Sequence, residues 1–152
     1  MPQIPVTMRS AEDRPLVKVV NDLIPNPAAG TAFSIVVPQG YRFNLVALYL
    51  QFVTDANVAN RFITVTVTTP SGTIFTYSHT TPIVAGETRT LCIGSGIANL
   101  TWTATLMNAT APFPPALTLE EGCAITITVA GIQVGDQFSL INSQVLSQFA
   151  AE

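Results

Sequence analysis

Short runs of β-branched and aromatic residues, separated by glycine, proline and asparagine, fill the sequence from residue 31 onward. In residues 61–69 isoleucine and valine alternate with threonine, and residues 124–132 repeat this pattern. Alternation of this kind places one face of a strand on a core and the other in solvent. Helical periodicity is absent from windows longer than about ten residues, except near the C-terminal end. The sequence therefore predicts an all-β protein.

The spacing of these runs predicts an antiparallel β-sandwich of jelly-roll type. Turn residues separate about eight or nine runs at intervals of roughly 8–12 residues, and proline-rich loops such as 111–115 disfavour an up-and-down barrel. An immunoglobulin-like sandwich stays open, although no Cys–Trp–Cys spacing supports it. Residues 42–54 are apolar at successive positions, which predicts a central strand covered on both faces. Strands are expected at 33–37, 42–54, 61–69, 73–79, 88–93, 100–107, 116–119, 124–132 and 137–141.

Two terminal segments differ from the sandwich, which is assigned to residues 31–142. Residues 1–30 contain five prolines and are expected to form an extended N-terminal arm. Within this arm, residues 16–20 are expected to form a strand, either on the sheet edge of a neighbouring molecule or at an edge of their own domain. Residues 143–152 are assigned to a C-terminal tail. Within it, residues 143–149 are expected to form a short helix with its apolar side chains on one face.

Charged side chains are scarce, at 10% of the residues against about 25% in ordinary soluble proteins. The net charge of −3 and the lack of a basic stripe argue against nucleic-acid binding. The longest apolar run is too short to cross a membrane. The first residues lack the pattern of a secretory signal, so we expect synthesis in a cytoplasm, where Cys92 and Cys123 stay reduced.

The sequence offers little catalytic chemistry. His79 is the only histidine, and a site built on it needs a nucleophile and an orienting carboxylate. One imidazole cannot hold zinc. The adjacent Glu120 and Glu121 point to opposite faces of a strand and cannot flank one glycosidic bond. We therefore predict no catalytic residue, no cofactor and no metal site.

Two weaker possibilities concern binding. Asp55, Asn57 and Asn60 supply oxygen atoms in one loop, but their spacing matches no calcium loop, and hydrogen bonds that shape a turn explain Asp55 and Asn57 better. Aromatic residues such as Trp102 and Tyr77 can stack on sugars if they are exposed, whereas burial in the core is the simpler interpretation.

Assembly explains the scarcity of charge better. The cores of protein interfaces are depleted of charged residues, and oligomerisation covers open strand edges. We therefore expect a chain that associates with copies of itself and with a larger particle.

A resemblance agrees with this expectation. Residues 54–67, the Pro70-Ser71-Gly72 hairpin and residues 119–129 resemble small structural proteins of tailed-bacteriophage virions. More narrowly, they are similar to capsid auxiliary (decoration) proteins of jelly-roll type, with the resemblance covering residues 31–142. It implies a structural protein without catalytic residues that binds the outer surface of the phage head as an oligomer, often a homotrimer. Such a protein is made in the host cytoplasm and clamps neighbouring subunits of the major capsid protein.

The segments expected to bind partners are the arm and one loop. In the arm the candidates are Arg9, Arg14, Leu16 and Val17, and in the loop they are Asp55, Asn57 and Asn60. The sequence does not say which segment meets the capsid and which a sister subunit. The alternative function is a carbohydrate-binding or adhesion module of a phage fibre or spike.

Overall fold

The computed structural model describes residues 18–103, 107–115 and 117–149, with side chains described from residue 24 to residue 147. The described residues contain no helix, and therefore none long and apolar enough to cross a membrane. The described residues form ten strands: β1 Lys18–Ile24, β2 Phe33–Val36, β3 Tyr41–Val53, β4 Phe62–Thr69, β5 Gly72–Ser78, β6 Thr88–Ser95, β7 Asn108–Phe113, β8 Thr118–Leu119, β9 Ala124–Ala130 and β10 Gln137–Phe149.

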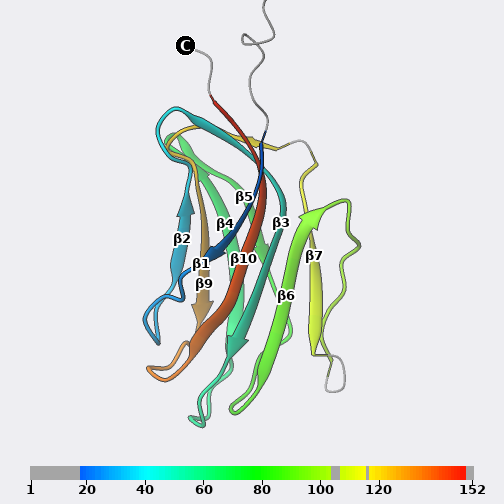
Figure 1. Ribbon diagram of the computed structural model, residues 1–152. Coiled ribbons are helices and arrows are strands. Elements are labelled where there is room, and N and C mark those ends of the chain that lie inside the picture. The colour runs from blue at the N-terminus through cyan, green and yellow to red at the C-terminus, as the bar shows by residue number, and fades with distance from the viewer. Residues whose placement is uncertain (1–17, 104–106, 116, 150–152) are drawn as a thin grey trace, which may run out of the picture.

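The strands pair in a nested order. β1 pairs with β10, β2 with β9, β3 with β6 and β4 with β5, all antiparallel. Pairing of β10 with β3 and of β9 with β4 then produces two sheets, ordered β1-β10-β3-β6-β7 and β2-β9-β4-β5. The two sheets lie face to face (Figure 1). This connectivity is that of a jelly roll with β7 and β8 inserted before β9, which confirms the predicted sandwich.

The alternating strands behave as their sequences predict. In β4 the side chains of Ile63, Val65 and Val67 are fully buried, while the intervening threonines face outward. In β9 Ile125 and Ile127 are buried in the same way. These side chains meet the inner face of the other sheet in a single apolar core. Burial of apolar area between the sheets is what holds such a sandwich together.

The central strand β3 differs from its prediction. It does lie between β10 and β6, but in the single chain only its inner face is covered, and Tyr49 on the outer face is 37% exposed. A β-bulge explains the apolar run. Leu45 pairs with Val145 and Ala47 pairs with Gln144, which leaves Val46 without a partner in β10. The bulge shifts the alternation by one residue, so successive apolar positions do not require two covered faces.

The first and last described strands, β1 and β10, lie in the β1-β10-β3-β6-β7 sheet, which we call the front sheet. The helix predicted for residues 143–149 is wrong, because β10 continues to Phe149 and pairs with β3 on one side and β1 on the other. Its residues alternate in burial with the period of a strand, and Ser143, Val145 and Ser147 face inward. Residues 18–24, assigned to the arm, form β1 at the edge of the same sheet. Arg9, Arg14, Leu16 and Val17 lie outside the described residues.

The segment after β6 was also predicted differently. Residues 100–107 were expected to form a strand, yet among their described members only Leu100 makes a bridge, with Thr110. The strand is β7, which includes part of the loop expected at 111–115 and runs parallel to β6. Pro112 is accommodated because β7 lies at the edge of its sheet, where a missing amide donor costs little.

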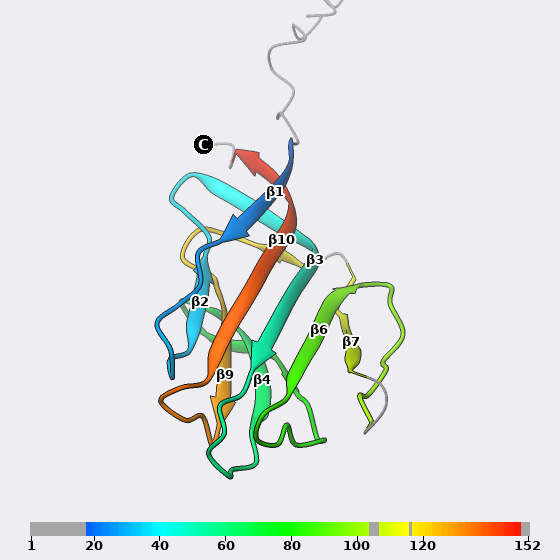
Figure 2. The ribbon, with the colours of Figure 1, turned by 60° about the horizontal axis from the view of Figure 1, so that its bottom comes forward.

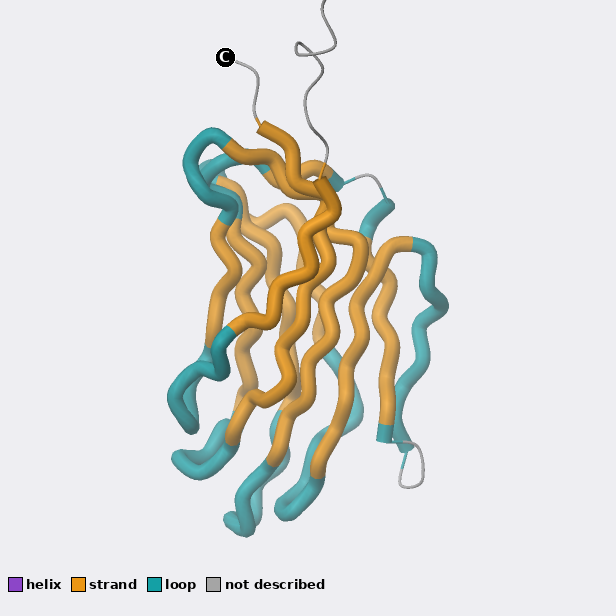
Figure 3. The backbone as a smooth tube through the Cα atoms, viewed as in Figure 1, coloured by secondary structure: helices purple, strands orange, loops and turns teal. Residues whose placement is uncertain are grey.

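The sandwich has two ends with different loops (Figures 2 and 3). We call one the Arg61 end, formed by loops 54–61, 79–87 and 131–136. The other is the terminus end, where Lys18 at the start of β1 pairs with Ser147 near the end of β10. The thirteen residues of β10 span about 40 Å between the ends, at roughly 3.3 Å per residue. The loop containing Asp55, Asn57 and Asn60 is therefore far from the point where the chain enters β1.

Candidate interaction surfaces

A fully buried arginine organises the Arg61 end. The Arg61 side chain has no exposed area, and its Nε and Nη2 each donate to one carboxylate oxygen of Asp136 over 3.0 Å. The same Nη2 donates to Asp55 Oδ1 over 2.7 Å, and Nη1 donates to the carbonyl of Ala59 over 2.9 Å. A buried guanidinium persists only when its donors are paired in this way. Sequence reasoning missed this cluster, because Arg61 and Asp136 are brought together only by the pairing of β4 with β9.

Asp136 fastens the neighbouring loops as well. Its carboxylate accepts hydrogen bonds from the backbone amides of Asp55, over 2.9 Å, and Gln133, over 2.7 Å. Burial by itself raises the pKa of Asp136, but the hydrogen bonds from Arg61 and from these amides outweigh it and hold the pKa below its usual value. The carboxylate is therefore ionised at neutral pH and balances the charge of Arg61.

The predicted turn chemistry of the 54–61 loop is present. Asp55 accepts hydrogen bonds from the Asn57 amide over 3.0 Å and from the Asn57 side chain over 2.6 Å. These bonds form the local turn that aspartate favours. The Asp55 carboxylate is therefore bound to Arg61 and Asn57, whereas the side chains of Asn57 and Asn60 are exposed to solvent. Within the described residues no group of three histidine, cysteine, aspartate or glutamate side chains could hold a metal ion.

Close backbone contacts fix the same loops. Gly131 has a positive φ of 76°, and a Cβ atom built there would lie 2.3 Å from the carbonyl oxygen of Asn60. A Cβ atom on Gly135 would lie 2.8 Å from Asp55 Oδ2. Neither position can accept a side chain without movement of the loops. The Arg61 end is therefore a tightly fitted arrangement.

This end presents apolar side chains to solvent. Val58 is 97% exposed and Val134 is 84% exposed, at the tips of the two loops that Arg61 and Asp136 join. Val84, in the third loop, is 45% exposed, and its carbonyl accepts a hydrogen bond from the Thr54 hydroxyl over 2.7 Å. These valines therefore project from loops whose backbone is held in place by hydrogen bonds.

Charge is distributed unevenly over the surface. Between residues 24 and 147, Arg61, Arg89 and Asp136 are buried, while Asp55 and Glu87 are largely covered in ion pairs. The remaining charged side chains are exposed and all lie at the terminus end: Arg42, Glu120 and Glu121. Arg42 pairs with Glu120 over 2.7 Å, and Glu121 accepts a hydrogen bond from the Gly40 amide. Across these residues the outward sides of both sheets carry no exposed charge away from that end.

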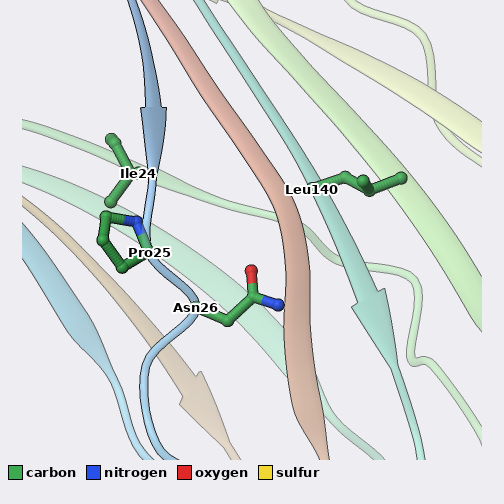
Figure 4. A pocket seen from close by; sticks show the side chains of 4 residues that line it. All are labelled: Ile24, Pro25, Asn26 and Leu140. Atoms are coloured by element: carbon green, nitrogen blue, oxygen red, sulfur yellow. The ribbon is translucent and has the colours of Figure 1, made fainter.

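The outer face of the front sheet is hollowed in two places. A hollow of about 280 Å³ is lined by Ile24, Pro25, Asn26 and Leu140. Figure 4 shows Leu140 pointing away from Ile24 and Pro25. The second hollow, of about 210 Å³, lies between β3, β6 and β10, and none of its lining residues is charged. Both are open depressions lined by uncharged side chains.

Leu140 is held in an unfavourable backbone conformation. It is the one non-glycine residue of the described chain with a positive φ, 48°, and it lies where the pairing of β10 with β3 shifts between Ser139 and Asn142. This conformation costs about 1–2 kcal/mol for an ordinary residue. The bulge turns the leucine outward, where it is 52% exposed.

The candidate catalytic and sugar-binding residues are mostly in the interior. His79 is 2% exposed and stacks on Trp102, which is 1% exposed. Burial lowers the pKa of His79, with the hydrogen bond to the Thr81 backbone opposing this shift. Trp102 therefore cannot offer a face to a sugar, and Tyr77 is half-buried beside His79. Tyr49 is the tyrosine on an open sheet face.

The two cysteines do not form a disulfide. Cys92 is half-buried in β6 and Cys123 is buried immediately before β9, and both are free thiols. Burial raises the pKa of the Cys92 thiol. A thiol with a raised pKa is a poor nucleophile at neutral pH, so neither the fold nor the environment favours cysteine chemistry.

Comparisons with known proteins give little. No family model matches the sequence, and no curated protein matches it. Among solved structures, a chain from the structure of infectious bursal disease virus, Gx strain, is similar over the whole of this chain, at 12% identity and a TM-score of 0.29. The matched region is 45% of that viral chain. A likeness of this size does not establish a common fold or function.

Proposed function

We propose that this chain is a non-enzymatic structural protein of a tailed-phage virion. It binds the outer surface of the head as an oligomer, a homotrimer in the form implied by the sequence resemblance, and clamps neighbouring major capsid subunits. The observation that carries the proposal is the near absence of exposed charge between residues 24 and 147 outside the terminus end. Surfaces of this kind suit permanent contact with other protein surfaces.

The fitted loops of the Arg61 end support the same proposal. Val58 and Val134 project from loops that the buried Arg61–Asp136 pair holds in place, so little conformational freedom is lost when they are covered. Asn57 and Asn60, exposed in the same loop, supply polar groups for the rim of such an interface. Asp55 contributes indirectly, by shaping the loop.

Catalysis finds no support around the single histidine. The ring of His79 packs between aromatic side chains, and its Nδ1 faces the backbone of Thr81. No carboxylate of the described residues hydrogen-bonds to it, and a buried imidazole cannot reach a substrate. The arrangement favours a structural role for His79.

The adhesion alternative is less well supported. A sugar-binding site needs exposed aromatic faces, and Trp102 is buried. Tyr49 is 37% exposed on the outer face of β3 and is the best remaining candidate for stacking. Glycan-array binding that is lost on Tyr49→Ala would favour this alternative over decoration.

Co-sedimentation with capsids tests the proposal. Purified protein is mixed with undecorated heads of the source phage, and the bound fraction is measured after centrifugation over a range of salt concentrations. We expect the wild-type chain to pellet with the heads. The double variant Val58→Asp/Val134→Asp should bind at least tenfold more weakly, because it introduces unpaired charge into a covered surface. Absence of wild-type binding at every salt concentration would contradict the proposal.

Two matched variants locate the contact. Val36→Asp changes another exposed valine, which lies in β2 and is 57% exposed. This variant should bind like the wild type. Deletion of residues 1–15 should weaken binding while circular dichroism stays unchanged, because the sandwich is complete from β1 onward. Equal loss of binding in Val36→Asp would show that the valines of the Arg61 end have no special role.

A further inference from the structure

The chain has one histidine and one tryptophan, and the fold places them face to face. The ring centroids of His79 and Trp102 are 3.6 Å apart, with planes inclined by 14°. Both side chains are almost fully buried, and Trp102 Nε1 donates to the carbonyl of Thr81 over 3.3 Å. The pair thus joins the segment after β5 to the segment 97–103, which runs beside β7.

The hydrogen bonds of His79 fit its neutral form. Nδ1 lies 3.3 Å from the Thr81 amide nitrogen and 3.4 Å from the Thr81 carbonyl oxygen, so in the neutral ring it can accept from the amide or donate to the carbonyl. Nε2 is buried and has no hydrogen-bond partner among the described residues. The doubly protonated ring carries a proton on each nitrogen, so Nδ1 then donates to the Thr81 carbonyl while the proton on Nε2 has no acceptor among the described residues. The Thr81 carbonyl also accepts the hydrogen bond from Trp102 Nε1.

The charged groups on the surrounding elements are already paired. On β5, the Tyr77 ring lies 6.3 Å from His79, and burial raises the pKa of its hydroxyl, so it is neutral. Beside Trp102, the Thr103 carbonyl is bound by Arg89, whose guanidinium pairs with Glu87.

The strand next to His79 offers no free carboxylate either. The His79 amide donates to the Ile63 carbonyl in β4, and Arg61 at the start of that strand is bound to Asp55 and Asp136. No carboxylate among these neighbours is left to receive an imidazolium ion. Stacking on the indole offsets part of the burial cost of a cation, but it does not supply an acceptor for Nε2.

We propose that the His79–Trp102 stack is an acid-sensitive latch that keeps the Trp102 side chain packed in the sandwich and releases it when His79 takes up a proton. Release exposes Trp102 at the Arg61 end of the molecule, close to the loop that carries Val84. Acidification thereby changes the apolar surface that this end presents. The latch belongs to the single chain and does not depend on the proposed virion function.

The direction of the pH dependence follows from the pKa of His79. Burial lowers this pKa below the unfolded value of about 6.5, and the bond to Thr81 recovers only part of the shift. The closed state therefore has its full stability above about pH 6.5 and loses it as the pH falls below that value. The ratio of open to closed molecules rises by at most about tenfold per pH unit, until the pH falls below the folded pKa.

Fluorescence of the single tryptophan measures the latch directly. The full chain is titrated from pH 8 to pH 4.5, a range in which Glu87 and Asp136 stay ionised because their pKa values are lowered. We expect a red shift of the emission maximum with a one-proton dependence and a midpoint below 6.5. Hydrogen exchange of the Trp102 indole N–H, which donates to the Thr81 carbonyl, should accelerate over the same range. His79→Phe keeps an aromatic ring against Trp102 without a titrating group, and its emission should not change with pH.

A second measurement protects the test against a variant that fails to fold. In the wild-type chain, the imidazole carbon and nitrogen resonances of His79 report its protonation by NMR. We expect them to titrate together with the tryptophan emission. Emission and exchange that stay constant to pH 4.5, or that change equally in a folded His79→Phe, would overturn the latch, as would titration of His79 without any change at Trp102.

Discussion

The two ends of the sandwich use the same kind of ion pair in opposite surroundings. At the Arg61 end, the Arg61 and Asp136 side chains have no exposed area and share two hydrogen bonds. At the terminus end, the paired side chains of Arg42 and Glu120 are 45% and 53% exposed. Removing one partner of a buried pair leaves a buried charge without compensation. When one partner of an exposed pair is removed, water solvates the charge that remains. The first pair therefore specifies how the loops fit together, and the second contributes little to the fold.

Removal of the buried guanidinium should give the largest effect. Arg61→Met keeps much of the side-chain volume but leaves Asp136 without its partner, and we expect a loss of about 3–5 kcal/mol in the free energy of unfolding. Chemical denaturation followed by circular dichroism measures it. A loss below about 1 kcal/mol would remove the distinction between the two ends.

Glycine-to-alanine substitutions test how closely the backbone is packed at each end of the sandwich. Gly131→Ala places Cβ against the Asn60 carbonyl at a positive φ, and we expect a loss of about 2–4 kcal/mol in unfolding free energy. Gly40, at the terminus end, has a similar φ of 77° but open space around it. Gly40→Ala should therefore cost only the conformational part, about 1–2 kcal/mol. Equal losses in thermal or chemical denaturation would mean that the loops of the Arg61 end are not tightly fitted.

Low pH should lower the free energy of unfolding by protonating the Asp136 carboxylate at the Arg61 end. Because the pKa of Asp136 is lowered in the folded chain, its stabilising contribution is complete above its unfolded pKa of about 3.9 and is lost as the pH falls through the folded value. The loss is at most about 1.4 kcal/mol per pH unit. Denaturation curves of wild type and Asp136→Asn between pH 5 and pH 2.5 should converge as the pH falls. Parallel curves would show that Asp136 does not titrate with folding.

The exposed pair should give the smallest effect. Arg42→Ala removes a salt bridge between side chains that are about half exposed, and we expect a change of about 0–1 kcal/mol in unfolding free energy. Addition of 0.5 M salt should reduce even this difference, because exposed charges are screened. A loss comparable to that of Arg61→Met in the same denaturation assay would contradict the comparison.

The sequence predicts strands well where burial follows a simple alternation. In β4 and β9 every second side chain enters the core, so the alternating pattern determines the strand and its inward face. It predicts the bounds of β3 but not which of its side chains face the core, and it misplaces β7. A bulge at Val46 changes the alternation in β3, and β7 forms by parallel pairing with β6, which no local pattern records. The tail was misassigned because a short apolar run is compatible with both a helix and a strand.

The site was less predictable than the fold. The turn around Asp55 and Asn57 was visible because its hydrogen bonds join residues two positions apart. Arg61 and Asp136 are separated by 75 positions, and the stacked His79 and Trp102 lie in different loops. Their partnerships depend on the jelly-roll pairing, so only the folded chain reveals them.

Light scattering coupled to size-exclusion chromatography tests the central claim, which is that so uncharged an exterior must be covered by other protein surfaces. The full chain is measured from micromolar to millimolar concentration in physiological salt. We expect a defined oligomer, with a mass that is a small multiple of the 16.1 kDa chain. A homogeneous species of 16.1 kDa that persists at millimolar concentration would contradict the account.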